Sequence, residues 1–170
     1  YEVMIKTSDR ESCRTSVDLR AGTKIAGKLI LTDLSCKTQE KKINSKNEKD
    51  IYEELAYAAY DCWYQFGEGE VDFLTDYDWG YGNNWCFICS RFDFDRKVQQ
   101  EFSNLDGFYD YLSKEKIPLD DKQQTFLEYM NADASEKLDP PDISMDIDTS
   151  EPFYVVFFGD KRQNFWKDMM

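Results

Sequence analysis

Three cysteines, Cys62, Cys86 and Cys89, bracket the most aromatic stretch of the chain, and their spacing is the first that could carry chemistry. Cys86 and Cys89 lie in the string WCFICS, which has the WCxxC spacing of a redox dithiol. Such a dithiol places its first cysteine at a helix N-terminus, where the helix dipole stabilises the thiolate. WCFICS continues instead into an aromatic, strand-like run. A thiol–disulfide redox protein with Cys86 and Cys89 as its reactive pair is therefore only our second alternative.

A structural zinc site is another chemistry open to these cysteines. Such a site needs four soft ligands, usually with each CxxC in a tight turn that contains glycine or proline. WCFICS contains neither residue, and the chain has no histidine. We therefore expect disulfide bonds, and we expect no zinc and no cofactor.

The absence of histidine also limits catalysis, because histidine is the commonest proton shuttle in enzymes. Without it, no serine or cysteine triad can be completed. The sequence contains no Walker motif and no dinucleotide-binding glycine motif. An ordinary hydrolytic enzyme is disfavoured.

Acidic residues beside aromatic residues suggest a different kind of site. Glu68, Glu70 and Asp72 lie close in the sequence to Trp79 and Trp85. Glycosidases and sugar-binding surfaces use carboxylate pairs beside aromatic platforms. However, the chain has 34 acidic residues, so such a cluster is also expected by chance. A saccharide-binding or glycan-cleaving module is our first alternative.

Asp76, Asp78 and Gly80 match the start of a calcium-binding loop. No bidentate glutamate follows at the distance that such a loop requires. Asp76 and Asp78 are therefore incomplete calcium candidates, and we predict no metal site.

Two elements must position the central cysteines. Apolar residues at steps of three and four predict a helix over residues 51–66, with Cys62 on its buried face. Residues 85–94 are apolar at the start of both faces, which predicts a central strand. Cys86 and Cys89 are an odd number of residues apart, so only one of them can face the helix. Cys86 shares its face with Ile88 and Phe92, and we predict a Cys62–Cys86 bridge.

The other cysteines complete the disulfide prediction. Cys13 and Cys36 form the natural second pair, between the N-terminal element and the end of the first long strand. Cys89 is then a buried thiol or is paired elsewhere. Because five is odd, one thiol is left over or joined to another chain. Five reduced cysteines in a cytosolic protein are the competing interpretation, since free cysteine is a common core residue.

The remaining elements define the predicted fold class. We expect a helix over residues 8–22, with a strand at 15–19 as the alternative, and helices near 96–102, 108–114 and 121–130. Strands are expected at 24–32, 38–43, 71–74 and 143–147, and a turn at 150–152 leads to a buried strand at 153–158. Residues 75–84 and 131–142 are predicted surface loops. Together these elements predict one α+β domain over residues 1–170, with a mostly antiparallel sheet, helices on one face and disulfide stabilisation.

Charge and hydropathy restrict the partners. The net charge is −13, which repels nucleic acid and anionic lipid headgroups. The longest apolar run, FYVVFF, is far shorter than the roughly 20 residues that span a bilayer. The chain opens on Tyr1, so we expect any membrane anchor to lie outside this sequence.

Several strings resemble a group of uncharacterised, membrane-anchored surface proteins of small-genome archaea. They are RESCRTSV, ELAYAAYDCWYQFGEGEVDFL, NNWCFICSRFDFD, GFYDYLSKEKIP and TFLEYM, and the similarity covers nearly the whole chain. The resemblance implies an anchored exterior domain, with residues 1–22 as a stalk-proximal helix and Cys62, Cys86 and Cys89 in its framework. It implies no activity.

The sequence therefore favours a non-enzymatic, extracytoplasmic domain on a cell surface that acts through protein–protein contacts or self-assembly. Tyrosine and tryptophan are enriched at interfaces, and three of them lie together in the predicted loop 75–84. We expect Tyr77, Trp79 and Tyr81 to be contact residues.

Overall fold

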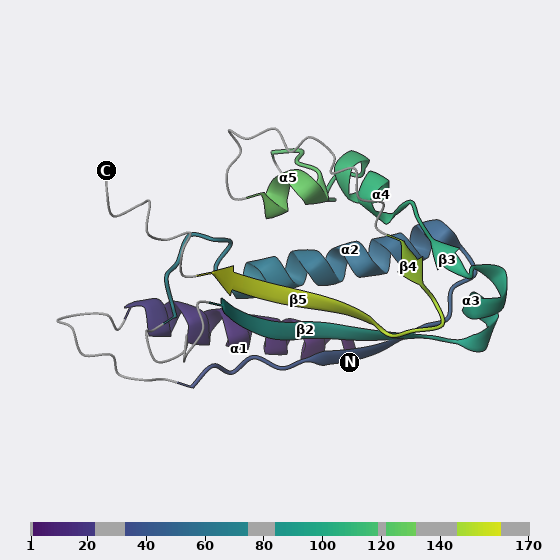
Figure 1. Ribbon diagram of the computed structural model, residues 1–170. Coiled ribbons are helices and arrows are strands. Elements are labelled where there is room, and N and C mark those ends of the chain that lie inside the picture. Colours follow the sequence, from purple (N-terminus) through teal and green to yellow (C-terminus); the bar gives the residue numbers. More distant parts are fainter. Residues whose placement is uncertain (1, 23–32, 75–83, 119–121, 132–145, 161–170) are drawn as a thin grey trace. The chain divides into compact units, whose positions relative to one another are not determined.

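The computed structural model describes residues 2–22, 33–74, 84–118, 122–131 and 146–160 (Figure 1). These residues form helices and two sheets, which confirms the predicted α+β class. The chain divides into two compact units. Unit 1 contains Tyr1–Thr38, Cys62–Cys89 and Val156–Met170, and unit 2 contains Gln39–Asp61 and Ser90–Val155.

The larger sheet has three strands, β1 (Gln39–Ile43), β2 (Asn84–Phe94) and β5 (Phe153–Asp160), in the order β1-β2-β5. The predicted central strand at 85–94 is confirmed as β2. Strand β1 runs parallel to it, with Gln39 opposite Ser90 and Ile43 opposite Phe94. Strand β5 runs in the opposite direction to β2 (Figure 1). The sheet is therefore mixed, and β5 lies at its edge.

Helix α1 spans Glu2–Gly22, which confirms the predicted N-terminal helix and rules out the strand alternative at 15–19. The helix ends at the predicted Gly22 but begins well before the predicted start at Ser8. Serine and glutamate are also tolerated inside a helix, so the capping pattern at Ser8 and Glu11 did not mark the first turn. An ion pair between Arg14 and Asp18, one turn apart, links two turns of the helix.

Helix α2 spans Glu48–Gln65 and confirms the helix predicted at 51–66. It begins earlier than predicted because the side chain of Asn47 caps it, accepting the Lys49 backbone N–H at 3.1 Å. The positions at steps of three and four are buried as expected. They are Ile51, Leu55, Ala58 and Cys62. Gly67 in the following turn has a φ of +88°, which favours glycine.

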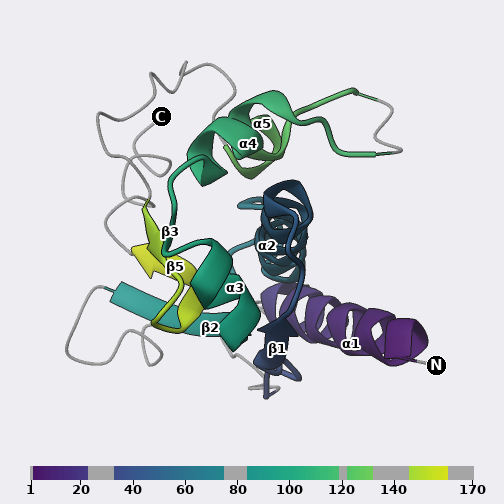
Figure 2. The same cartoon turned by 90° about the vertical axis from the view of Figure 1, so that its right-hand side faces the viewer.

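Unit 2 holds the larger apolar core. Its short helices are α3 (Arg96–Glu101), α4 (Phe108–Lys114) and α5 (Phe126–Met130), and α4 packs against α5 (Figure 2). Strand β3 (Asn104–Leu105) pairs antiparallel with β4 (Ile147–Asp148). The fully buried side chains of this core come from several elements, and they include Ile43, Ile51, Leu55, Phe92, Val98, Leu105 and Phe126.

Several predicted elements are wrong or lie outside the described residues. Residues 71–74 form no strand. Helix α5 starts at Phe126 rather than at residue 121, because Thr125 and Glu128 form a capping box there. Only residues 146 and 147 of the strand predicted at 143–147 are described, and β4 (Ile147–Asp148) pairs with β3 rather than forming the predicted hairpin with β5. The strand predicted at 24–32 and nearly all of the loops at 75–84 and 131–142 lie outside the described residues.

Candidate functional site

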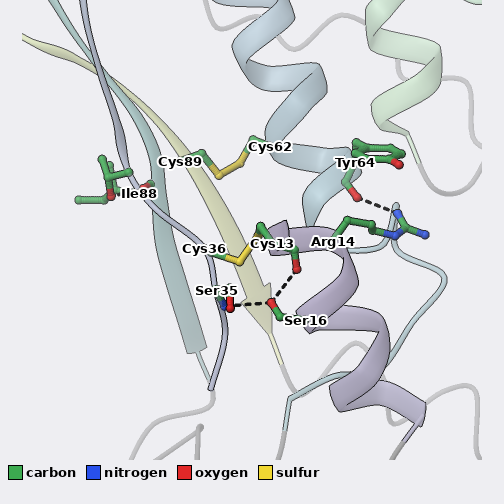
Figure 3. The surroundings of a disulfide bond; sticks show 10 residues. Cys13, Arg14, Ser16, Ser35, Cys36, Cys62, Tyr64, Ile88 and Cys89 are labelled. Carbon is green, nitrogen blue, oxygen red and sulfur yellow. Dashed lines mark hydrogen bonds between the residues drawn. A yellow bond between two sulfur atoms is a disulfide. The ribbon is translucent and has the colours of Figure 1, made fainter. Parts of the chain in front are cut away.

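Two disulfide bonds organise unit 1 (Figure 3). The Cys13–Cys36 bond joins α1 to the segment before β1 and confirms that prediction. The second bond joins Cys62 of α2 to Cys89 of β2, so the predicted Cys62–Cys86 bridge is wrong. Two such bonds indicate an oxidising, extracytoplasmic environment.

The predicted bridge is wrong because β2 does not alternate regularly. Cys89 and Ser90 follow each other in the strand, and both are buried. Further along, the even-numbered Phe92 and Phe94 face the core of unit 2. In unit 1 the inward side chains are odd-numbered, so the inward positions shift by one residue within the strand. The prediction assumed that every second residue along the whole strand faces the same side, and this assumption selected the wrong cysteine.

Cys89 is bonded to Cys62 rather than to Cys86, and it is 3% exposed. Cys86 is the one free cysteine of the five, all of which lie in the described residues, and its side chain is exposed. The thiol–disulfide redox alternative stays a prediction.

Helix α1 is fastened to the end of α2 by Arg14. Its Nη1 donates to the Tyr64 carbonyl at 2.7 Å (Figure 3). The same Nη1 donates to Glu68 Oε2 at 2.9 Å, and Nε donates to Asp18 Oδ2 at 3.1 Å. Burial lowers the pKa of Arg14, but the hydrogen bonds and charges of Asp18 and Glu68 outweigh it, and the pKa is raised. The guanidinium groups of Arg10 and Arg14 lie 5.0 and 5.1 Å from the Tyr64 ring.

Aromatic rings fill the interior of unit 1 around Phe66. Four rings have centroids between 4.4 and 5.7 Å from its own, and they belong to Phe73, Trp85, Phe87 and Phe157. Phe87 comes from β2 and Phe157 from β5, two neighbouring strands. Both residues therefore point from the sheet toward the same interior. The residues on either side of them in each strand must point to the opposite face.

That opposite face of the two strands is exposed. Ile88 on β2 is 43% exposed, and on β5 Val156 and Phe158 are 45% and 60% exposed. Figure 3 shows Ile88 on the side of β2 away from the Cys62–Cys89 bond. The free thiol of Cys86 lies two residues before Ile88 and so faces the same way. We name the set Cys86, Ile88, Val156 and Phe158 the outer face.

The exposure of the outer face contradicts the predicted burial of residues 153–158, and the sequence did not predict this face. Residues 153–158 were predicted to form a buried strand, because all six are apolar. In the structure only the odd-numbered residues are turned inward, and Tyr154, Val156 and Phe158 are exposed. A uniformly apolar run has no alternation to show that one side lacks a cover, so no pattern in the sequence indicated this face.

The predicted saccharide residues have other contacts where they are described. Glu68 is paired with Arg14, and Trp85 packs among the rings of unit 1. Glu70 and Asp72 are exposed. Trp79 lies outside the described residues, as do the contact candidates Tyr77 and Tyr81 and the calcium candidates Asp76 and Asp78. Saccharide binding stays a prediction.

A shallow groove of about 400 Å³ runs along α1. Most of its lining residues carry a hydroxyl group, although most of the lining surface is apolar; the residues are Ser8, Glu11, Ser12, Thr15, Ser16, Leu19 and Ser35. Ser16 uses its hydroxyl inside the fold, donating to the Cys13 carbonyl at 2.7 Å and accepting the Ser35 backbone N–H at 2.9 Å (Figure 3). None of these described lining residues is a nucleophile paired with a base.

The titratable groups with the largest pKa shifts lie in the core of unit 2. Burial raises the pKa of Tyr52 to about 12, and the hydroxyl donates to Glu48 at 2.8 Å while accepting the Gly107 N–H at 3.0 Å. Burial likewise raises the pKa of Tyr111 to about 12. The Tyr52 ring packs against the rings of Phe108 and Tyr111, so both tyrosines contribute to the core of unit 2.

No three histidine, cysteine, aspartate or glutamate side chains in the described part of the chain gather as metal ligands would. None of the described helices is long and apolar enough to cross a membrane. Comparison with protein-family models, with curated proteins and with solved structures found no match.

Proposed function

We propose that this protein is a non-enzymatic extracytoplasmic domain that works through contacts with other proteins. One observation carries the proposal: three large apolar side chains, Ile88, Val156 and Phe158, are exposed together on two paired strands. Soluble proteins rarely leave a contiguous apolar patch uncovered unless it binds something. The outer face is therefore the contact surface.

The composition of the outer face supports a protein partner. Its members are uncharged, and the centre of a protein interface is depleted in charged residues and enriched in aromatic ones. Phe158 is the most exposed of the large apolar residues in the described part of the chain, at 60%. A protruding aromatic ring that enters a partner's pocket is a common source of binding energy. Phe158 is the expected anchor.

The cell-surface location is part of the same proposal. The disulfides support an oxidising compartment, and the sequence resemblance supports a tether outside this chain. Tyr77, Trp79 and Tyr81 remain candidate contact residues on the basis of the sequence.

A photo-cross-linking experiment tests the contact surface. A photoreactive amino acid replaces Ile88 in the intact chain, which is then irradiated in an envelope extract of its source cells. We expect polypeptide adducts whose yield falls at least tenfold when the photoreactive chain also carries Phe158→Glu, because the added charge disrupts the apolar contact.

Leu19 provides the matched control. It is exposed to nearly the same extent as Phe158, at 57%, but lies on α1. The photoreactive chain with Leu19→Glu carries the same added charge and should give adducts in the wild-type yield. The proposal is wrong if no polypeptide adduct forms from position 88, or if Phe158→Glu lowers the yield no more than Leu19→Glu does.

A further inference from the structure

We infer that the partner of the outer face is a second copy of this chain, and that a disulfide between the two Cys86 residues locks the pair. The inference rests on the proposed function and goes further by naming the occupant. It follows from three features of the described residues: the leftover thiol, the apolar surroundings of that thiol, and the distribution of charge.

The cysteine count makes any Cys86 disulfide intermolecular. Cys13 bonds to Cys36 and Cys62 bonds to Cys89, which leaves Cys86 alone among the five. The thiol is exposed in a protein that the other bonds assign to an oxidising environment. A leftover cysteine in such a protein suggests pairing between chains. A second copy always supplies a thiol in the same surroundings.

The position of Cys86 suits a symmetric contact. Most homodimers have a twofold axis, so the same surface patch meets itself and a residue near the axis meets its own copy. Cys86 shares the outer face with Ile88, and the neighbouring strand adds Val156 and Phe158. Two such faces packed together would cover all six apolar side chains. A disulfide can bridge two sheets that pack face to face, as in immunoglobulin domains.

Charge favours this face over the rest of the surface. Two copies carry −13 each and therefore repel each other across most orientations. Ile88, Val156 and Phe158 carry no charge. Contact through this patch therefore places no charged side chain of the outer face against its own copy.

The size of the patch explains why a covalent bond is needed. Three partly exposed apolar side chains offer on the order of a few hundred Å², whereas a stable interface buries about 800 Å² on each partner. Apolar packing alone would give a short-lived encounter. The encounter would still hold the two thiols near each other long enough to react, and the disulfide would then prevent dissociation.

The reaction needs an oxidant, for which a small-molecule disulfide such as glutathione disulfide suffices. The Cys86 thiolate of one copy attacks the oxidant, forming a mixed disulfide and releasing one glutathione thiolate. The Cys86 thiolate of the second copy then attacks the protein sulfur and releases the second. The two protons lost from the cysteines go to the two glutathione thiolates, and two electrons reduce the oxidant.

Oxidation of the purified full chain by glutathione disulfide tests the inference. Mass spectrometry without reductant should show a species of twice the chain mass that mild reductant converts to monomer. Cys86→Ser should abolish it. Phe158→Glu should slow its formation at least tenfold and accumulate the glutathione mixed disulfide, whereas the matched Leu19→Glu should form dimer at the wild-type rate. Val156→Glu replaces Phe158→Glu if the latter fails to fold by circular dichroism.

Two results would overturn the inference. One is dimer formation at equal rates in Phe158→Glu and Leu19→Glu, which would mean that the outer face does not guide the reaction. The other is a wild-type chain that ends only as the glutathione adduct. If cross-linking from position 88 still captures a different polypeptide, self-pairing fails while the proposed contact surface stands. If no polypeptide is captured, the proposed function fails as well.

Discussion

Removal of the Cys62–Cys89 disulfide should lower the free energy of unfolding by about 3.5 kcal/mol. The bond closes a loop with a sequence separation of 27 residues. The chain-entropy relation gives a loss of unfolded-state entropy worth about 3.5 kcal/mol at 25 °C for a loop of that length. The double variant Cys62→Ala/Cys89→Ala removes the bond. Alanine is preferred to serine, because both positions are buried and a serine hydroxyl would be left without a partner.

The measurement is urea and thermal unfolding, followed by circular dichroism without reductant. The double variant and its reference chain both carry Cys86→Ala, which prevents exchange with the free thiol, and the wild type is measured beside them. For a chain of this size, 1 kcal/mol shifts Tm by about 2–4 °C, so the expected loss is about 7–14 °C. The urea m-value should rise, since the unfolded chain without the bond exposes more surface.

The same experiment distinguishes the observed Cys62–Cys89 bond from the Cys62–Cys86 bond that the sequence predicted. Cys86→Ala alone should leave stability within about 0.5 kcal/mol of the wild type, because Cys86 is exposed and unbonded in the monomer. A loss of about 3.5 kcal/mol from Cys86→Ala alone would instead mean that Cys62 bonds to Cys86. That result would refute the shift of the inward positions within β2.

Three further predictions concern stability. Arg14→Ala should cost about 1–3 kcal/mol in urea unfolding, because it removes charged hydrogen bonds to a backbone carbonyl and to Glu68, whereas Arg14→Lys should recover part of the loss. The pKa of Tyr52 is raised to about 12 in the folded protein, so its contribution to the free energy of unfolding should be complete below pH 10 and fall as the pH rises through about 12. Urea unfolding at pH 9 and 11.5 measures this fall. Gly67→Ala should lower the free energy of unfolding by about 2 kcal/mol or more, because φ is +88° and the new methyl group would clash with the Val71 side chain. Gly22→Ala, at a helical position with open space around it, should raise the free energy of unfolding by roughly 0.5–1 kcal/mol. Equal effects at the two glycines would contradict the assigned backbone geometry.

Local patterns predicted the elements with strong periodicity. The repeat at steps of three and four placed α2 and put Cys62 on its buried face, as the structure confirms. The long aromatic run placed β2, and Cys13 and Cys36 were predicted to link the N-terminal element to the end of the first long strand; the structure has this bond. These features depend on residues near one another in the sequence, and periodicity measures such relations directly.

Relations between distant segments were harder to predict. The pairing of β4 with β3 and of β1 with β2 in parallel joins segments more than 40 residues apart, and the sequence holds no record of which strands meet. Cys62 reaches Cys89 because the inward side of β2 changes within the strand. Parity assumes a regular strand, and a shift of one residue reverses its conclusion.

The sequence alone determined the compartment: five cysteines without histidine indicated disulfides rather than a metal site or a catalytic triad, and two disulfides are present. Only the tertiary structure decided which cysteine is left over and where it lies. An apolar strand such as β5 has the same composition whether one or both of its faces are covered. Its exposure is set by the elements that pack on each side, and the fold packs Phe157 against Phe66 while leaving Val156, Phe158 and Cys86 exposed.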